Sequence, residues 1–450
     1  MGTAVGKWLK ACEVYLDQRM IVMALLGFSS GFPLLLVFGT LNLWLKDAGV
    51  SYALIGIFSL VKTPYSLKWV WSPIVDRIEL PLFRRLGRRR GWAVFTQLLL
   101  FAGVLGMSSV NPGENIKTMA ILAIFVAFAS ASQDIVLDAY RIESFRPKEQ
   151  GAGTASFVFG YRLGLFFSGA IALYLADGMS WSAVYVIMSL GALVGMSTML
   201  LSKEPIAKIK QAKLRGNFGE RLNVFMKTAV INPFLDFMKN ENWKIILLFI
   251  FLYKMSDAYV GPMAYPFYDD MGFSKTEIAT VSKIYGVAAT IIGSIIGGLL
   301  VSRYGIMKSL FVCGIFQGLS NLMFAIQAGV GYNVGMLMVT ISVENISGGM
   351  ATTAFVAYLS SLCNVMYTAT QYALLSSLMS FARDIFAASS GYMVEQMSWE
   401  TFFVITTLMS LPGLLLLHFM RKKGIDKAAY KVRKNANKPR AKAHRKRKSD

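Results

Sequence analysis

Twelve apolar runs, each about as long as a membrane-spanning helix, restrict the fold of this chain more than any other feature. A helix that crosses the hydrocarbon core needs about 20 mostly apolar residues. The runs lie near residues 20–43, 52–73, 92–110, 116–140, 152–176, 181–201, 244–266, 276–301, 308–328, 334–362, 366–391 and 401–420. Only 16% of the residues are charged, against roughly a quarter in soluble domains. We therefore predict an all-α integral membrane protein with 12 transmembrane helices.

The net charge of +21 is distributed unevenly between the two sides of the predicted membrane. With the N-terminus inside, the inner segments hold most Lys and Arg residues, including those within 84–90, 203–239 and 421–448. The outer connections hold Lys46, Lys117 and Lys275. Because Lys and Arg favour cytoplasmic loops, we expect both termini to be cytoplasmic. The basic tail could bind RNA or anionic lipid, but a disordered cytoplasmic tail is the favoured interpretation, so no nucleic-acid partner is expected.

The residue types that carry metal or nucleophilic chemistry are sparse. Cys12, Cys313 and Cys363 have no metal-ligand spacing, and the two His residues, His418 at the end of the last predicted span and His444 in the tail, lie far apart in the sequence. No nucleophile and base stand in a recognisable arrangement. We expect no metal, no cofactor and no enzymatic activity.

A polar, basic stretch at 202–242 separates six spans from six, and the two halves repeat one another in order. The string Asp47–Ser51 before the second span corresponds to Asp270–Ser274 before the eighth, and Ala139-Tyr140 recurs as Ala357-Tyr358. The expected segments are an N-terminal cytoplasmic segment (1–19), a first six-helix half (20–201), a central linker (202–242), a second half (243–420) and a basic tail (421–450).

Two sets of residues carry a resemblance to known families. The Asp76-Arg77 pair and the Gly87–Arg90 string resemble the loop between spans two and three of the major facilitator superfamily, whose halves enclose substrate near the midplane. Further strings resemble the AmpG-type muropeptide permeases and together cover nearly all of residues 20–420. They are Gly27–Pro33, Leu67–Pro73, Ser132–Arg141, Gly160–Gly164, Tyr253–Ala258, Glu344-Asn345 and Ala369–Leu375.

This resemblance implies a major facilitator fold and a location in the bacterial cytoplasmic (inner) membrane. It also implies proton-coupled import of cell-wall turnover fragments, N-acetylglucosaminyl-1,6-anhydro-N-acetylmuramyl peptides, by alternating access. The expected partners are the muropeptide, protons and membrane lipids, and we expect a monomer. The alternatives are a carrier of another bulky anion, such as an acyl-coenzyme A, and a non-transporting membrane sensor.

Ionised groups inside a span are costly and usually functional, and several lie in the predicted spans. Asp134 is the first candidate for proton coupling, with a structural carboxylate as the alternative. Asp257 is the second candidate, and it can pair with Lys254 three residues earlier. The candidate substrate-binding residues are Gln133, Arg162, Lys254, Lys283, Glu344, Asn345, Gln371 and Arg383. Arginine matches carboxylates with two parallel hydrogen bonds, so Arg162 and Arg383 are expected to bind substrate carboxylates.

A second group of charges lies near the expected inner ends of the spans. Asp134, Asp138 and Arg141 share one helix face because they are spaced i, i+4 and i+7. The predicted gate consists of Asp76, Arg77, Asp138, Arg141 and Glu143. We expect these residues to form a charge cluster that opens and closes with the inner gate.

Overall fold

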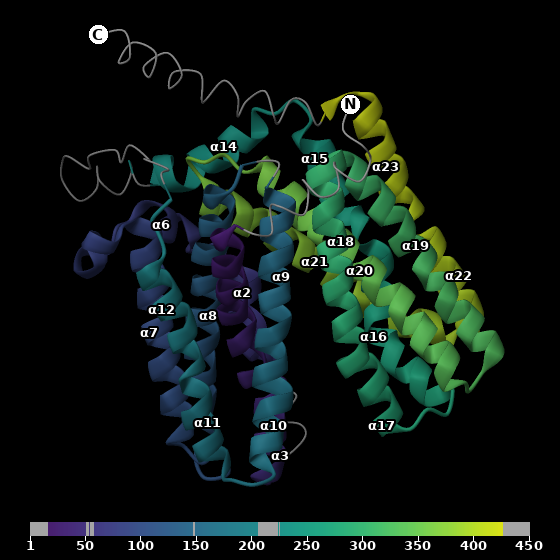
Figure 1. Cartoon of the computed structure of the whole chain (residues 1–450), viewed down its shortest axis with the longest axis horizontal. Helices are drawn as coiled ribbons and strands as arrows, with labels where there is room; N and C mark the ends of the chain where they lie inside the picture. The colour runs from purple at the N-terminus through teal and green to yellow at the C-terminus, as the bar shows by residue number, and fades with distance from the viewer. Residues whose placement is uncertain are drawn as a thin grey trace.

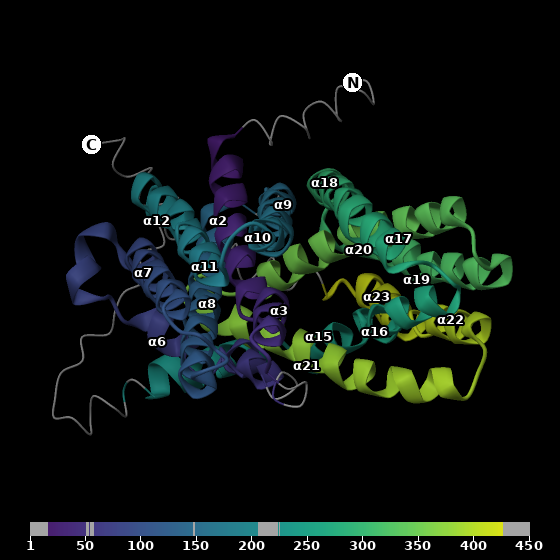
Figure 2. The ribbon, with the colours of Figure 1, turned by 90° about the horizontal axis from the view of Figure 1, so that it is seen from below.

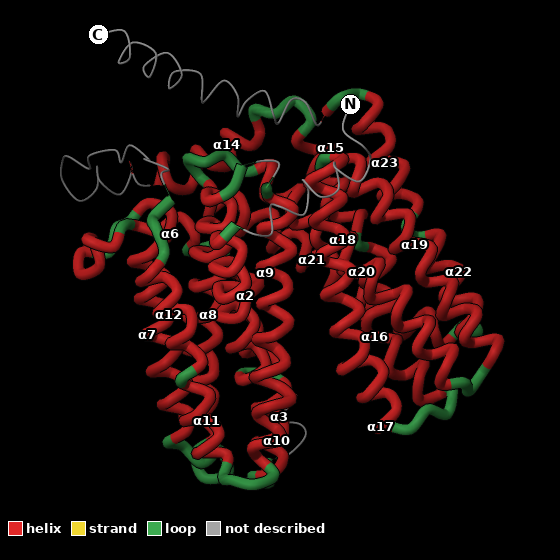
Figure 3. The backbone as a smooth tube through the Cα atoms, in the orientation of Figure 1, coloured by secondary structure: helices red, strands yellow, loops and turns green. Residues whose placement is uncertain are grey.

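Helices that stand side by side in two groups make up the described part of the chain (Figure 1). The structure is a computed structural model that describes residues 17–50, 54, 58–146, 149–205, 224 and 226–425. Those residues form helices, turns and loops, with no strand among them (Figure 3). Ten of their helices are long and apolar enough to cross a membrane. The predicted all-α fold is confirmed.

The first group runs from α2 to α12. Its elements are α2 (Gln18–Leu36), α3 (Gly39–Asp47), η2 (Phe58–Lys62), α5 (Thr63–Leu67), α6 (Ser72–Arg77), η3 (Pro81–Leu86), α7 (Arg88–Ser108), α8 (Ile116–Ser144), α9 (Gln150–Phe166), η4 (Phe167–Ile171), α10 (Ala172–Ala176), α11 (Trp181–Ser189) and α12 (Gly191–Leu201). We call this group the first half.

The segments η5 (Met226–Ile231) and α14 (Asn232–Met238) connect it to the second half. The second half contains α15 (Trp243–Tyr253), α16 (Met255–Asp270), α17 (Lys275–Ile278), η6 (Ala279–Tyr285), α18 (Gly286–Tyr304), α19 (Ile306–Val330), α20 (Val334–Leu362), α21 (Thr368–Glu395), α22 (Trp399–Leu408) and α23 (Leu411–Lys422). Seen from below in Figure 2, α18 lies beside α9, and α21 extends beneath both halves.

Two expected spans differ from long apolar helices. The described part of 52–73 is divided into η2, α5 and the start of α6, with a turn at residues 68–71. Pro64 and Pro73 lie in the first turns of α5 and α6, where proline is well tolerated because no hydrogen bond needs its missing N–H. The eleventh span, α21, is a 28-residue helix. It is long enough to cross a membrane, but it is not among the ten helices that are also apolar enough.

Glycines let α2 and α9 pack with their backbones in contact. A Cβ atom on Gly27 would lie 2.0 Å from the carbonyl oxygen of Phe157, and one on Gly160 would lie 1.7 Å from that of Ala24. Small residues at such positions allow close helix approach in membranes. The α2–α9 pair therefore forms a rigid centre for the first half.

The internal repeat is visible as matching hydrogen bonds. Trp181 donates through Nε1 to Oδ2 of Asp47 at 2.9 Å, and in the second half Trp399 donates to Oδ2 of Asp270 at the same distance. The glycine two residues after each aspartate has positive φ. We call the end of the molecule that holds these bonds the Asp47 end, and the opposite end the Asp76 end.

The described contacts between the halves gather at the Asp76 end. At the start of α9, a Cβ atom on Gly151 would lie 2.6 Å from Cβ of Val301, near the end of α18. The α8 residue Ile142 belongs to an apolar core of second-half residues, and Ala369 and Ala373 of α21 belong to one of first-half residues. This interleaving joins the two halves at that end.

Candidate functional site

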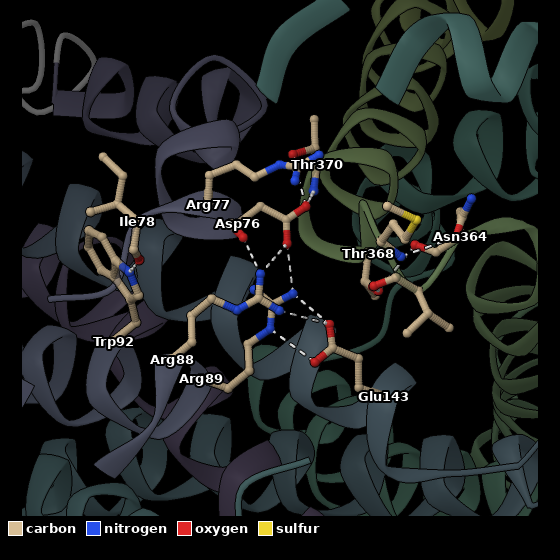
Figure 4. Close-up of polar contacts among 12 residues, drawn as sticks. Asp76, Arg77, Ile78, Arg88, Arg89, Trp92, Glu143, Asn364, Thr368 and Thr370 are labelled. Atoms are coloured by element: carbon tan, nitrogen blue, oxygen red, sulfur yellow. Dashed lines mark hydrogen bonds and ion pairs between the residues drawn. The ribbon is translucent and has the colours of Figure 1, made fainter. Parts of the chain in front are cut away.

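A buried cluster of four charged side chains lies at the Asp76 end (Figure 4). Nη2 of Arg89 lies 2.7 Å from Oδ1 of Asp76 and 2.5 Å from Oε1 of Glu143. Arg88 lies 3.4 Å from Oδ1 of Asp76 and 3.7 Å from Oε1 of Glu143. Arg88 also donates to the backbone carbonyl of Asp76. Two carboxylates thus balance two guanidiniums away from water, which a buried ionic group requires.

Local backbone geometry places the arginines of this cluster. Gly87 has φ +92° and precedes α7, and a Cβ atom there would lie 2.7 Å from the carboxyl carbon of Glu204. That carboxylate accepts the backbone N–H groups of Arg89 at 2.8 Å and Arg90 at 3.0 Å. A carboxylate at a helix N-terminus satisfies free N–H groups and complements the helix dipole. The start of α7 is therefore held in place, and Arg89 points to Asp76 and Glu143.

Two polar contacts extend from this region to the second half. Oγ1 of Thr370, at the start of α21, donates to Oδ2 of Asp76 at 3.2 Å, and its backbone N–H lies 3.4 Å from the same oxygen. Arg141 donates to Oγ of Ser360 in α20 at 3.0 Å, and to Thr154 in its own half at 3.0 Å. These bonds join the two halves at the Asp76 end.

The remaining predicted gate residues lie beside these contacts. Nη2 of Arg141 lies 3.1 Å from Oδ1 of Asp138, and its guanidinium lies 5.3 Å from the ring centre of Tyr372. Arg77 donates to the backbone carbonyl of Thr228 at 3.0 Å, and its guanidinium lies 4.8 Å from the ring centre of Tyr367. All five predicted gate residues are thus found at the Asp76 end.

Sequence reasoning did not assign the partners of the predicted gate residues, which are Arg88, Arg89, Thr370 and Ser360. The Gly87–Arg90 string contains both arginines. In the sequence analysis it supports only the resemblance to the superfamily, and it indicates no partner for either side chain. Thr370 lies within the string Ala369–Leu375, where the neighbouring Gln371 was selected instead. Ser360 carried no sequence signal.

A second group of charges lies deeper in the molecule. Nζ of Lys254 lies 2.6 Å from Oδ2 of Asp257 and donates to Oγ1 of Thr352 at 3.2 Å. A cavity with room for about one water molecule lies beside the pair. Glu344 interacts electrostatically with Asp257, Lys254 and, from the first half, Arg162. The structure therefore brings together four of the predicted proton-coupling and substrate-binding residues.

Asp134 lies in the first half near its own set of polar groups. Oγ of Ser30 in α2 donates to Oδ1 of Asp134 at 2.6 Å. Its charged neighbours are Lys68 and Asp138, and the phenol of Tyr161 also interacts with it. The carboxylate therefore has one close hydroxyl donor from α2 and a lysine neighbour from the turn between α5 and α6.

Three other predicted substrate-binding residues form hydrogen bonds to other segments of the protein. Gln133 is fully buried and donates to the backbone carbonyl of Ser29 at 2.6 Å. Asn345 accepts from Oγ1 of Thr290 at 2.7 Å and so joins α20 to α18. Gln371 lies at the Asp76 end and donates to the carbonyl of Pro233 at 3.0 Å.

The last two candidates lie in other parts of the second half. Arg383 is exposed and lies 3.4 Å from Oδ1 of its neighbour Asp384. Lys283 lies in η6, and its side chain is outside the described part of the structure. In the described residues no three His, Cys, Asp or Glu side chains are arranged to hold a metal ion.

Comparison with known proteins identifies the family. Residues 19–188 match the family model described as Acetyl-coenzyme A transporter 1, and residues 246–448 match that of the Major Facilitator Superfamily. The chain is 38% identical over 412 residues to the anhydromuropeptide permease of Escherichia coli K12, which covers 91% of this chain and 81% of that protein. It is 36% identical over 413 residues to a Rickettsia felis relative named AmpG 4, which covers 91% of this chain and 98% of that one.

Solved structures of major facilitator proteins share the fold. The proton:xylose symporter XylE bound to 6-bromo-6-deoxy-D-glucose aligns with a TM-score of 0.65 at 12% identity, covering 91% of this chain and 96% of that one. The human organic anion transporter MFSD10 aligns with a TM-score of 0.60 at 12% identity, covering 91% and 99%. The 12-helix major facilitator fold predicted from the sequence is confirmed, and the chain is a multi-pass protein of the inner membrane. The chain belongs to the AmpG family of major facilitator permeases, which are transporters and not enzymes.

Proposed function

We propose that this permease imports N-acetylglucosaminyl-1,6-anhydro-N-acetylmuramyl peptides, that it does so by alternating access, and that a proton gradient drives the uptake. The observation that carries the proposal is the 38% identity, over 91% of the chain, to an Escherichia coli protein named anhydromuropeptide permease. The arrangement of charges described above is consistent with such a substrate.

Charge complementarity supports a substrate with several carboxylates. Arg162 of the first half and Lys254 of the second half contribute cations to one electrostatic neighbourhood with Glu344. A muropeptide offers peptide carboxylates to these cations, and Arg162 can hold one with two parallel hydrogen bonds. Because the two cations come from different halves, a substrate bound to both would link the halves.

The proton is assigned to Asp134 and Asp257. When a substrate carboxylate binds Lys254, Asp257 loses its 2.6 Å partner, and its carboxylate is then free to take a proton. Substrate binding and proton binding would then assist each other. Asp134 serves as the second proton site, with Ser30 as its hydrogen-bond donor.

The Asp76 end is assigned to the cytoplasm, together with both termini. This orientation places the basic residues of α6, η3 and the start of α7 on the inner side, where Lys and Arg concentrate. The structure then represents the state in which the cytoplasmic end is closed, and substrate release requires the Asp76–Thr370 and Arg141–Ser360 bonds to break. The protein is proposed to act as a monomer.

The test is uptake of labelled anhydromuropeptide into proteoliposomes that contain the purified protein, with and without an imposed inward proton gradient. Accumulation that requires the gradient supports both parts of the proposal. Uptake that does not depend on the gradient removes the proton coupling, and no uptake by folded protein removes the substrate assignment.

A second candidate function is transport of an acyl-coenzyme A. It is favoured by the match of residues 19–188 to the acetyl-coenzyme A transporter model, and the phosphates of coenzyme A would also suit cationic side chains. In the same proteoliposomes, competition by excess acetyl-coenzyme A for muropeptide uptake, together with its own accumulation, would favour this candidate.

A further inference from the structure

The segment η5–α14 between the halves has an apolar face that no described residue covers. Ile231, Leu235 and Met238 are spaced i, i+4 and i+7, so they share one side of the helix. Their exposed fractions are 48%, 51% and 45%, which is high for large apolar side chains in the middle of a short connecting helix.

The other side of the same segment is attached to the transporter. Ala229 and Pro233 are buried, and Phe237 packs against an apolar core of the second half. Oδ2 of Asp236 accepts from Nδ2 of Asn364 at 2.9 Å and from Nε2 of Gln371 at 3.3 Å. The segment is therefore held in a fixed orientation, with its apolar face directed away from the protein.

We infer that this face lies in the headgroup region of the lipid bilayer at the Asp76 end, as an interfacial amphipathic helix. In Figure 1, α14 lies across the ends of the helical columns, as expected of a helix in the plane of the interface. An amphipathic helix of this kind buries its apolar side chains at the boundary between headgroups and acyl chains.

Two features identify lipid as the partner of this apolar face. They are the exposed lysines of the segment and its position just before the tryptophan that begins α15. Lys227, Lys239 and Lys244 are exposed in and around the segment, against one exposed carboxylate at Glu241. Each such lysine is attracted to an anionic leaflet. Trp243 begins α15 five residues after Met238, and tryptophan is enriched at membrane interfaces. Asp236 does not oppose the attraction, because Asn364 and Gln371 bind its carboxylate.

Site-directed fluorescence tests the inference on the full chain in nanodiscs of phosphatidylethanolamine and phosphatidylglycerol. The three native cysteines are replaced by alanine, and single cysteines at Leu235 or Glu241 carry an environment-sensitive dye. Both positions are exposed, so the label does not disturb the packed side of the helix. A phospholipid with a doxyl group near its headgroup reports contact with lipid, and iodide reports contact with water.

The dye at Leu235 is expected to lose most of its fluorescence to the doxyl lipid and little to iodide, and the dye at Glu241, in the turn after α14, should show the reverse. A dye at Ile231 repeats the Leu235 measurement on the same face. Equal iodide quenching at Leu235 and Glu241 would overturn the inference, because the face would then lie in water. Resistance of the Leu235 dye to both quenchers would also overturn it, because protein would then cover the face.

Discussion

Replacing Thr370 by valine should shift the transporter toward the conformation that is open at the Asp76 end. Valine keeps the shape of threonine but removes the hydroxyl that donates to Oδ2 of Asp76 across the two halves. The backbone N–H of residue 370 remains near the same oxygen, and Arg88 and Arg89 still balance the carboxylate. The substitution therefore removes one inter-half hydrogen bond and leaves the charge cluster intact.

The size of the shift follows from the type of bond. A hydrogen bond to a charged group contributes about 1.5 to 3 kcal/mol, and each 1.4 kcal/mol changes an equilibrium constant by about tenfold. The ratio of open to closed molecules should therefore rise by about 10-fold to 150-fold in the Thr370→Val variant.

A cysteine at Val301 measures this ratio. Val301 is 2% exposed, and it packs against α9 at Gly151, so reagents reach it only when the halves separate at the Asp76 end. In protein without native cysteines, the rate of maleimide labelling at Val301→Cys is proportional to the open population when opening and closing are fast. The labelling rate should rise with Thr370→Val by the factor given above.

Thr368→Val is the matched control. Thr368 is also buried at the start of α21, but its hydroxyl donates to the carbonyls of Asn364 and Val365 in its own segment. Its replacement should leave labelling of Val301→Cys nearly unchanged. Equal labelling rates in the Thr370→Val variant and the unmodified protein would refute the assignment of the Asp76–Thr370 contact to the gate.

Three further predictions concern the rest of the chain. Gly160→Ala should lower the thermal unfolding midpoint in detergent, because overpacking costs about 1–3 kcal/mol and the new Cβ would lie 1.7 Å from a backbone oxygen; Gly261→Ala, with no atom within 4 Å, is its control, and equal midpoints would contradict the close packing. Asp134→Asn should abolish gradient-driven accumulation in proteoliposomes but keep exchange across equal gradients, and unchanged accumulation would exclude Asp134 as a proton site. Arg162→Ala should weaken binding, measured by calorimetry, more for fragments with the full peptide than for the bare disaccharide, whereas equal losses would argue against carboxylate recognition.

Hydropathy and charge predicted the helical columns and the grouping of charges at their ends. The repeat was also readable, since Asp47 and Asp270 stand in matching strings and both accept a tryptophan N–H in the structure. Along a helix, the height of a residue follows from 1.5 Å per position. A charge near the end of a predicted span, such as Glu143 or Arg141, is therefore expected near the end of its helix, and α8 ends at Ser144.

The rotation of each helix about its own axis was not predictable in the same way. Gln133 and Asp134 are neighbours in sequence, yet Gln133 faces the backbone of α2 at Ser29 while Asp134 meets the Ser30 hydroxyl. Which neighbour a side chain contacts depends on how distant segments pack together. An apolar pattern that polar groups interrupt on several faces does not determine this packing. For this reason the partners Arg89 and Thr370 became visible only in the structure.

The tryptophan–aspartate bonds at the Asp47 end have a mechanical consequence. They join the connection between the first two spans of each half to the last hairpin of that half, so each half is braced at the end far from the gate. The 29-residue helix α8, which carries Glu143 near its end, is a rod about 43 Å long. Tilting such a rod by about 10° around its middle displaces its tip by about 4 Å. Glu143 at that tip and Asp76 both bind Arg89, so a rocking of the whole first half by this angle would also carry Asp76 beyond the reach of the Thr370 hydroxyl.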